Sequence, residues 1–243
     1  MRRVLFRWRG ITVWSYPAML YVGLVMGVVA GNIAAHAAGL DAFRVYVATL
    51  LLIPPSLIGA RLLHVITHWD MYRNDRARIW DTNEGGQAQY GGLIVMVPLS
   101  FPLLYALQLP LGSFWDVSSF TILVGMVFTR IGCLLNGCCA GRSSSIGLWL
   151  PNVNGVWKKR IPTQLLEAAW AVLLLASMIV IWPLLPFKGA LFLYVVAGYA
   201  LGRLLLESWR EHAPGTGRIT VHHAISFGMI LLSAAAFTAN WPK

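Results

Sequence analysis

Residues 10–40 read GITVWSYPAMLYVGLVMGVVAGNIAAHAAGL and contain no Asp, Glu, Lys or Arg. This stretch is longer than the ~20 apolar residues that an α-helix needs to cross a bilayer. The sequence therefore predicts a membrane helix here, and it repeats the pattern along the chain. Further uncharged runs cover residues 45–60, 85–115, 117–129, 168–187 and 219–242.

The composition supports a polytopic membrane protein. Of the 243 residues, 58% are apolar and 12% are charged, and the charged share is about half that of an ordinary soluble domain. The formal net charge is +10, which in a soluble protein would suggest a nucleic-acid partner. In a membrane protein it indicates positive-inside topology or contact with anionic headgroups, so we expect no nucleic acid.

The breaks between apolar runs predict an all-α fold, in which about seven transmembrane helices of a single domain, residues 1–243, surround a lipid-accessible cavity. The first run is too long for the apolar core of a cleaved signal peptide, so we expect it to be a span. Pro54 and Pro55 predict a kink in the second helix, and residues 185–187 predict a tight antiparallel hairpin. The seven helices are expected near residues 12–35, 45–68, 90–108, 118–137, 164–184, 188–209 and 220–239.

Ionisable residues inside the predicted helices are the first candidates for function, because a charge at the bilayer centre costs about 2.5–3.5 kcal/mol on insertion scales. On the sixth helix, two arginines and one glutamate share a face with a tyrosine. The excess positive charge would be balanced by an anion such as a lipid phosphate; the alternative is an internal ladder in which Glu207 only neutralises the arginines. The candidates are Arg61, Arg130, Glu167, Arg203 and Glu207, with Tyr199 and Arg210 on the same face of the sixth helix.

Two glycine-rich segments are expected to border a binding site. Residues 125–142 begin as a helix and end in small, polar residues, and residues 85–92 begin the third span. Glycine permits close backbone approach to a ligand. Non-helical backbone at membrane depth is tolerated where it lines an enclosed or watery cavity.

Six motifs, in order over most of the chain, together resemble the prolipoprotein diacylglyceryl transferase family. The first three are residues 14–19, similar to the family's early Trp-Tyr-Gly span, Gly59-Ala60-Arg61, and the doubled glycine motif at residues 85–92. Residues 130–142 resemble the most diagnostic signature of the family. Residues 162–167 are similar to its Pro-Ser-Gln-Leu-Tyr-Glu motif, and Tyr199, Arg203, Glu207 and Arg210 resemble its late Tyr-Arg-Glu-Arg helix.

The resemblance implies an enzyme that moves the diacylglyceryl group of phosphatidylglycerol onto the thiol of a lipobox cysteine in a prolipoprotein. Glycerol phosphate would leave, and no cofactor is expected. Arg130 and Arg203 would hold the phosphate, and Glu167 and Glu207 would orient these arginines. The remaining substrate-binding residues would be Tyr16, Asn136 and Tyr199 at the glycerol headgroup, with Arg61, Gly141, Gln164 and Arg210.

The sequence departs from the family pattern at three positions. Tyr90 stands where the doubled glycine motif usually carries a histidine, the favoured thiol base, and it becomes the catalytic candidate there. Cys138 and Cys133 replace the usual Glu and Asn of the signature. A different acceptor, or a relative that binds or moves phospholipid without transferring it, is therefore the alternative. A solute transporter is disfavoured because the chain shows no inverted repeat.

A metal site at the three cysteines is a further alternative. Cys133, Cys138 and Cys139 could combine with His222 and His223, or with His64 and His68. However, the adjacent Cys138 and Cys139 lack the two-residue spacer common in zinc sites, and buried cysteine often serves as a small apolar residue. The sequence-based prediction is therefore no metal.

The orientation in the membrane has two conflicting indications. The distribution of Lys and Arg over seven spans places the N-terminus in the cytoplasm. The resemblance implies a multi-pass protein of the bacterial inner membrane, with the N-terminus outside and the active site toward the periplasm. The prediction follows the resemblance.

Overall fold

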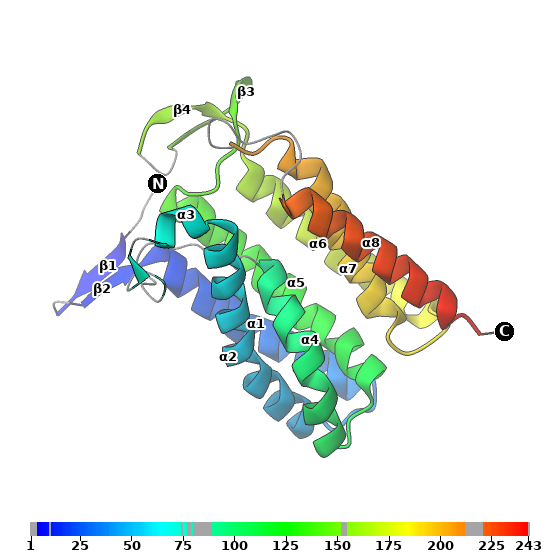
Figure 1. Ribbon diagram of the computed structural model, residues 1–243. Coiled ribbons are helices and arrows are strands. Elements are labelled where there is room, and N and C mark those ends of the chain that lie inside the picture. The colour runs from blue at the N-terminus through cyan, green and yellow to red at the C-terminus, as the bar shows by residue number, and fades with distance from the viewer. Residues whose placement is uncertain are drawn as a thin grey trace. The chain divides into compact units, whose positions relative to one another are not determined.

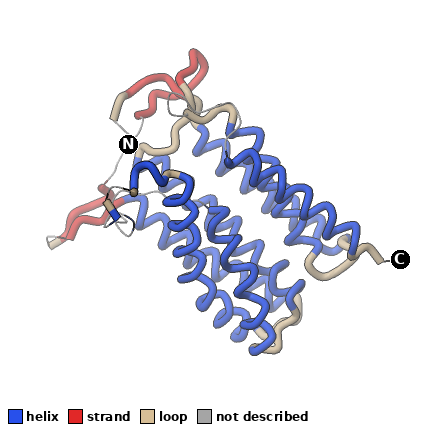
Figure 2. The backbone as a smooth tube through the Cα atoms, in the orientation of Figure 1, coloured by secondary structure: helices blue, strands red, loops and turns tan. Residues whose placement is uncertain are grey.

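The computed structural model describes residues 4–9, 11–73, 75–76, 79, 89–151, 155–211 and 221–242. Its helices and two short strand pairs are shown in Figures 1 and 2. The helices are α1 (Ser15–Ala37), α2 (Ala42–Thr67), α3 (Trp69–Tyr72), α4 (Gln89–Ala106), α5 (Leu111–Asn136), α6 (Thr163–Ile181), the 3₁₀ helix η3 (Trp182–Leu184), α7 (Ala190–Glu207) and α8 (Val221–Ala239). The strands are β1 (Val4–Trp8), β2 (Ile11–Trp14), β3 (Ser143–Pro151) and β4 (Trp157–Arg160).

All seven predicted helices are present, which confirms the all-α membrane class. In the described part of the chain, six helices are long and apolar enough to cross a bilayer, and the apolar helix Tyr90–Ala106 is shorter. The fifth and sixth predicted helices form a hairpin, in which Tyr194 of α7 donates to Ser177 of α6 at 2.9 Å. The helix α2 continues through Pro54 and Pro55.

Two boundaries differ from the prediction for physical reasons. The helix α5 begins at Leu111 rather than 118, because Asp116 is accommodated inside the helix by partners from a distant segment. The helix α1 begins at Ser15 rather than 12, because Ile11–Trp14 pairs antiparallel with Val4–Trp8.

The connection between α5 and α6 contains a second strand pair, which the sequence analysis did not predict. Strands β3 and β4 pair antiparallel, with Trp149 opposite Lys159 and an irregularity between Ser143 and Leu148. Ile146, Leu148 and Leu150 alternate along β3, a period-two pattern typical of a strand. This alternation is the feature of the sequence that could have predicted strand β3.

The chain divides into two compact units. Unit 1 comprises Met1–Ala34 and Trp115–Lys243, and unit 2 comprises Ala35–Phe114. Each unit has its own close helix packing.

In unit 1, α5, α6 and α7 share a buried apolar core. Leu123 and Met126 come from α5, and the other members come from the α6–α7 hairpin: Ala171, Leu174, Met178, Leu191 and Val195. Helix α1 lies against α5 through Gly23 and Gly27, where an added Cβ would meet Phe128 and the backbone of Thr121 and Gly125. Small residues allow such close approach between membrane helices.

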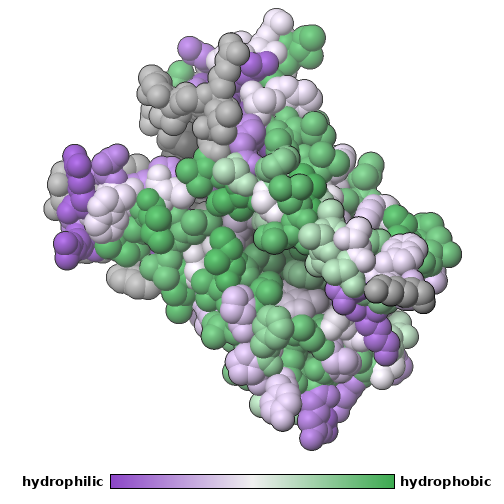
Figure 3. All heavy atoms as spheres, turned by 45° about the vertical axis from the view of Figure 1, so that its right-hand side comes forward, coloured by the Kyte–Doolittle hydropathy of each residue, from purple (hydrophilic) through white to green (hydrophobic). Residues whose placement is uncertain are grey.

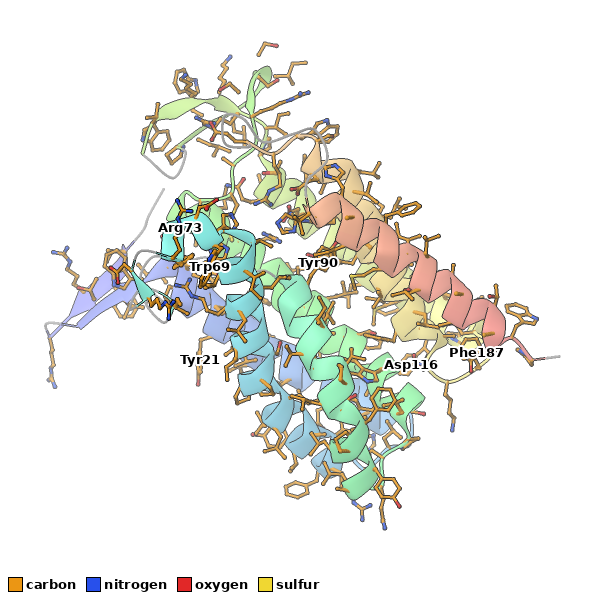
Figure 4. All side chains as sticks on the ribbon, viewed as in Figure 1. Tyr21, Trp69, Arg73, Tyr90, Asp116 and Phe187 are labelled. Carbon is orange, nitrogen blue, oxygen red and sulfur yellow. The ribbon has the colours of Figure 1, made fainter. Side chains whose placement is uncertain are left out.

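Asp116 connects α5 to the start of α7. Its carboxylate accepts hydrogen bonds from the backbone N–H groups of Gly189 at 2.7 Å and Phe192 at 3.0 Å. The first N–H groups of a helix lack partners within the helix. Asp116 therefore caps α7 from another helix, at the end marked in Figure 4 by Asp116 and Phe187.

In unit 2, α2 packs against α4 through glycines. An added Cβ on Gly59 would meet the carbonyl oxygen of Gly91 at 2.5 Å, and one on Gly92 would meet Ser56. The second half of the doubled glycine motif thus serves helix packing, and residues 85–88 of the motif lie outside the described residues. At the other end of the unit, Arg44 pairs with Asp41 at 3.2 Å.

Large apolar side chains point outward from the helices, as expected of surfaces that face lipid. Leu232 of α8 is 72% exposed, Val180 of α6 is 68% exposed and Ile33 of α1 is 66% exposed. Hydrophobic residues cover the visible sides of the helices in Figure 3. Exposed apolar area of this extent is rare on soluble proteins.

Candidate functional site

One buried carboxylate gathers three arginines. Glu167 lies near the start of α6, just after the first turn, and its Oε2 is 2.5 Å from Nε of Arg130 on α5. Its Oε1 accepts from Nη1 of Arg203 on α7 at 2.8 Å and from Nη1 of Arg210 at 2.9 Å. Segments that are far apart in the sequence therefore meet at this side chain.

A second carboxylate completes this group. Glu207 Oε2 lies 2.9 Å from Nη2 of Arg203, one turn earlier on α7, and 3.9 Å from Nε of Arg210. Three guanidinium charges thus face two carboxylate charges, which leaves one positive charge in excess. We call this group the guanidinium cluster: Arg130, Glu167, Arg203, Glu207 and Arg210.

Burial makes this excess charge significant. Arg130 is 8% exposed and Arg203 is 9% exposed, so water screens them weakly. Buried charges are usually paired, because their desolvation is costly when it is uncompensated. The cluster can therefore bind an anion of small size.

The packing of α6 on α7 sets the position of these groups. Trp170 of α6 donates its indole N–H to the carbonyl oxygen of Gly198 at 2.9 Å, and a Cβ on Gly202 would meet the same indole ring. The glycine at position 202 lets the indole lie directly on α7, whereas an added Cβ on Gly198 would meet Leu174. This contact fixes the register that places Glu167 opposite Arg203.

Arg210 lies beyond the end of α7 and is positioned by backbone contacts. Gly141 and Arg210 form an isolated antiparallel bridge, in which the N–H of Arg142 donates to the carbonyl oxygen of Trp209 at 2.9 Å. A Cβ on Gly141 would meet the carbonyl oxygens of Trp209 and Ile161. Gly141, predicted as a substrate-binding residue, thus has a structural contact that holds Arg210 in place.

Arg160 is a buried arginine that is absent from the residues predicted for the site. It is 2% exposed, pairs with Glu211 at 2.8 Å, and donates to the carbonyl oxygen of Gly141 at 3.4 Å. It therefore supports the strand bridge beside Arg210. The sequence did not indicate that Arg160 would be buried, because it follows two other basic residues, Lys158 and Lys159. In the structure, strand β4 buries Arg160 and exposes the two lysines.

The chain turns sharply after α5. Gly137 has φ of 78° and Cys139 has φ of 62°, a left-handed conformation that residues with a side chain seldom adopt. The start of α6 holds this turn, because Gln164 donates to the carbonyl oxygen of Cys138 at 2.6 Å and Thr163 to that of Cys139 at 2.7 Å. Gln164, predicted to bind substrate, thus contacts the signature segment.

The turn brings the three cysteines together. The sulfur atoms of Cys133, Cys138 and Cys139 all lie within 4.8 Å of one another. Hydrogen bonds from the Cys133 and Cys138 thiols lower the pKa of Cys139; burial opposes them, and the charges of Arg210 and Arg130 lower it further, so that it ends well below its ordinary value. The cysteines therefore border the guanidinium cluster.

The same electrostatic coupling acts on Arg210. Burial lowers the pKa of Arg210, but the charges of Glu167 and Cys139 outweigh burial and raise it above the ordinary arginine value. Arg210 therefore remains charged at any physiological pH.

The three predicted headgroup residues lie in the same unit. Tyr16 of α1 packs its backbone near Gly132 of α5, and its phenol is within electrostatic range of the three thiols and Arg130. Asn136 ends α5 and its side chain interacts with Cys138. Tyr199 of α7 lines a small void of about 10 Å³ together with Glu167 and Arg203.

A larger apolar cavity lies beside this region in unit 1. It has a volume of about 430 Å³ and lies between the end of α5, strand β3 and the start of α6. Its lining residues are Leu134, Leu135, Leu148, Trp149, Leu150 and Leu165.

Two predicted site residues belong to unit 2. Arg61 donates from Nε to the carbonyl oxygen of Ile79 at 2.8 Å, and its guanidinium lies 5.5 Å from the centre of the Tyr72 ring. Tyr90 is the second residue of α4, is labelled in Figure 4, and is 3% exposed. Arg61 therefore has local contacts that explain its burial within its own unit.

The histidines have other contacts. His64 and His68 stack with ring centroids 4.4 Å apart, and Nδ1 of His68 is 3.0 Å from the carbonyl oxygen of His64. Within the described ranges, the three cysteines form the one group of candidate metal ligands, and no histidine joins it.

Comparison with known proteins gives a consistent result. The family model for prolipoprotein diacylglyceryl transferase matches residues 3–239. The phosphatidylglycerol–prolipoprotein diacylglyceryl transferase of Halalkalibacterium halodurans is 28% identical over 221 residues, which cover 86% of this chain and 75% of the relative. The protein of that name from Clostridium kluyveri is 25% identical over 246 residues, with 98% and 96% covered. The one from Listeria monocytogenes is 32% identical over 197 residues, with 74% and 69% covered.

Proposed function

The chain belongs to the prolipoprotein diacylglyceryl transferase family, and we propose that it moves the diacylglyceryl group of phosphatidylglycerol onto a cysteine thiol of a prolipoprotein. The acceptor would be the lipobox cysteine at the end of the signal peptide. The observation that carries the proposal is the guanidinium cluster with its excess positive charge. Such a cluster suits a lipid phosphate.

The reaction is a displacement at carbon. The acceptor thiolate attacks the glyceryl carbon that bears the phosphate ester, so a C–S bond forms while the C–O bond breaks. The electron pair of the broken bond leaves with glycerol phosphate, and the thiol proton passes to a base. Positive groups that already face the departing oxygen stabilise the negative charge that develops there.

Arg130 and Arg203 are the proposed phosphate ligands. Both hold Glu167 with one part of the guanidinium group, and a guanidinium carries five N–H donors. A guanidinium can therefore contact a carboxylate and phosphate oxygens together, in a charge-assisted way. Glu167 and Glu207 orient the arginines and do not themselves contact the lipid in this scheme.

Tyr16, Asn136 and Tyr199 are the proposed contacts of the glycerol headgroup. Tyr199 borders the void next to Glu167 and Arg203, and Tyr16 lies within electrostatic range of Arg130. Each has a polar group on a side chain that can donate to a hydroxyl or a phosphate oxygen. Arg61 and Tyr90 are proposed as substrate-binding and catalytic residues on the motif resemblance alone.

The proposed setting is the bacterial inner membrane, with the site toward the periplasm. The six long apolar helices among the described residues make the chain a multi-pass membrane protein. The outer face is proposed because a lipobox cysteine would be presented there after export of the precursor.

The test is transfer from labelled phosphatidylglycerol to a lipobox peptide by purified protein. We expect Arg130→Ala and Arg203→Ala each to lower turnover by roughly 10²–10³-fold, as when one charge-stabilising donor is lost. Arg44→Ala is the matched control, because Arg44 is an exposed arginine of unit 2 paired with Asp41. Wild-type turnover in both cluster variants would rule out the phosphate assignment.

A second candidate function is binding or movement of phospholipid without transfer. Tyr90 and Cys138, which stand where the family usually has His and Glu, favour it. In the same assay, a thioether-linked diacylglyceryl peptide made by the wild-type chain would eliminate this alternative. Phosphatidylglycerol binding without such a product would support it.

A further inference from the structure

The three cysteines lie close together, and the proposed transfer from phosphatidylglycerol gives them no role. They are the only cysteines of the chain, and their sulfur atoms lie within 4.8 Å of one another. A zinc ion bonds thiolate sulfur at about 2.3 Å, which places the sulfurs of a tetrahedral site about 3.8 Å apart. Small side-chain rotations would bring these sulfurs to that spacing.

The backbone around the sulfurs is held in place. Cys133 is on the last turn of α5, and the N–H of Cys138 donates back to the carbonyl oxygen of Cys133 at 3.1 Å. The carbonyl oxygens of Cys138 and Cys139 are held by Gln164 and Thr163. Preorganised ligands with a supporting shell of hydrogen bonds are typical of built metal sites.

The turn also retains an unusual backbone conformation. Cys139 has φ of 62°, which is costly for a residue with a side chain. This conformation directs the third sulfur toward the other two, whereas a glycine would have adopted it without strain. Strain of this kind is often kept at functional sites.

We propose that Cys133, Cys138 and Cys139 bind a thiophilic d¹⁰ metal ion, for which Zn²⁺ is the appropriate probe. Three protein ligands leave one position open, the arrangement found in catalytic rather than structural zinc sites. The proposal departs from the sequence-based prediction of no metal, because folding supplies the spacing that the sequence lacks.

The open position has a chemical use that rests on the proposed function. The acceptor thiol can bind there as a thiolate and release its proton to solvent, since a thiol coordinated to zinc is deprotonated. The bound thiolate then forms the C–S bond while the C–O bond to phosphate breaks. The product is a neutral thioether, a weak ligand that dissociates. This route supplies a thiolate where Tyr90 and Cys138 replace the usual His and Glu.

The test of metal binding uses the full chain in detergent, reduced, stripped with a chelator and titrated with Co²⁺ as a spectroscopic stand-in for Zn²⁺. We expect thiolate-to-cobalt charge-transfer absorption that saturates at one equivalent and is displaced by Zn²⁺. Serine at any one of the three cysteines should weaken binding by more than the 10- to 100-fold typical of outer-shell changes. His64→Gln, in unit 2, is the control and should bind as the wild type does.

Two results would overturn the metal proposal. One is the absence of charge-transfer absorption at any Co²⁺ concentration. The other is a disulfide between two of the cysteines in protein alkylated directly in membranes, with no zinc in the purified chain; the cysteines would then be a redox pair.

The role of the open position is tested separately. A lipobox peptide added to the Co²⁺ form should intensify the charge-transfer absorption, and the same peptide with serine for cysteine should not. An unchanged spectrum would overturn the role in thiol activation. Arg203→Ala should keep the Co²⁺ spectrum while it loses transfer, so a failed phosphate site and a failed metal site give different results.

Discussion

Asp116 and Glu167 are two equally buried carboxylates of unit 1 that have different kinds of hydrogen-bond partner. Each is 5% exposed, and each lies on a helix apolar enough to span a bilayer. Asp116 accepts from the neutral N–H groups at the start of α7. Glu167 is surrounded by three guanidinium groups.

The difference teaches that burial alone does not identify a functional charge. The partial positive charge of a helix N-terminus is enough to stabilise one carboxylate. The Asp116 carboxylate therefore needs no cationic side chain as a partner. The guanidinium cluster has one more guanidinium than carboxylate, which supports the proposed binding of a phosphate. For these two carboxylates, the guanidinium partners of Glu167 support its place in the proposed site, whereas the backbone partners of Asp116 make a structural contact.

Removal of the Glu167 charge should give the largest loss of transfer. Glu167→Gln leaves three arginines, two of them buried, with one remaining carboxylate, and breaking a buried pair costs about 3–5 kcal/mol. We expect transfer from labelled phosphatidylglycerol to fall by more than about 10³-fold, beyond the loss of one donor. Asp70→Asn, at an exposed pair with Arg73, is the control. Turnover in Glu167→Gln at the control level would refute the comparison.

A change of shape at constant charge should have a smaller effect. Arg203→Lys keeps the positive charge but cannot bridge Glu167 and Glu207 as the guanidinium does, because ammonium lacks the planar fork. We expect kcat to fall by roughly 10- to 100-fold and more transfer to remain than in Arg203→Ala. If Lys and Ala reduce kcat equally, geometry rather than charge is decisive at this position.

A change of helix packing should act on the cluster indirectly. In Gly202→Ala the added methyl would press on the Trp170 indole and shift α6 against α7, which costs about 1–3 kcal/mol as overpacking. We expect roughly tenfold slower transfer from misplaced groups. Gly228→Ala on α8 is matched, because an added Cβ there meets nothing within 4 Å. Thermal unfolding followed by tryptophan fluorescence should separate the two variants.

The smallest effect on transfer is expected at Asp116. Asp116→Asn keeps the shape but loses the charge that accepts two backbone N–H groups, and hydrogen bonds to charged groups are worth about 1.5–3 kcal/mol each. The midpoint of thermal unfolding should fall while turnover per folded molecule stays at the wild-type level. A selective loss of turnover without a lower midpoint would assign Asp116 to the active site instead.

The sequence predicted the helices well, because the cost of a charge in hydrocarbon leaves long uncharged runs that composition alone reveals. It placed the start of α5 too late, because the hydrogen-bond partners of Asp116 come from residues more than seventy positions away. The β3–β4 pair was not predicted although Ile146, Leu148 and Leu150 alternate. The surrounding serines and basic residues make the same segment resemble a polar loop.

The candidate site was predictable as a set of residue types more than as a geometry. The one-face spacing of Arg203 and Glu207 follows from helix periodicity. The meeting of Arg203 and Glu167 depends on the contact of Trp170 with α7, and the position of Arg210 depends on its bridge to Gly141; no periodicity reveals either. The buried position of Arg160 depends likewise on a strand bridge between distant segments. The roles of Arg61 and Tyr90 stay predictions.

Polar contacts hold the α6–α7 hairpin near both of its ends. Asp116 ties its closed end, at residues 189–192, and Glu167 ties its open end to Arg203 and Arg210. Two contacts this far apart hold α6 and α7 together along their length. We therefore do not expect a lipid to enter between these two helices. On the proposed function, the lipid would enter and its products would leave past other elements of the chain.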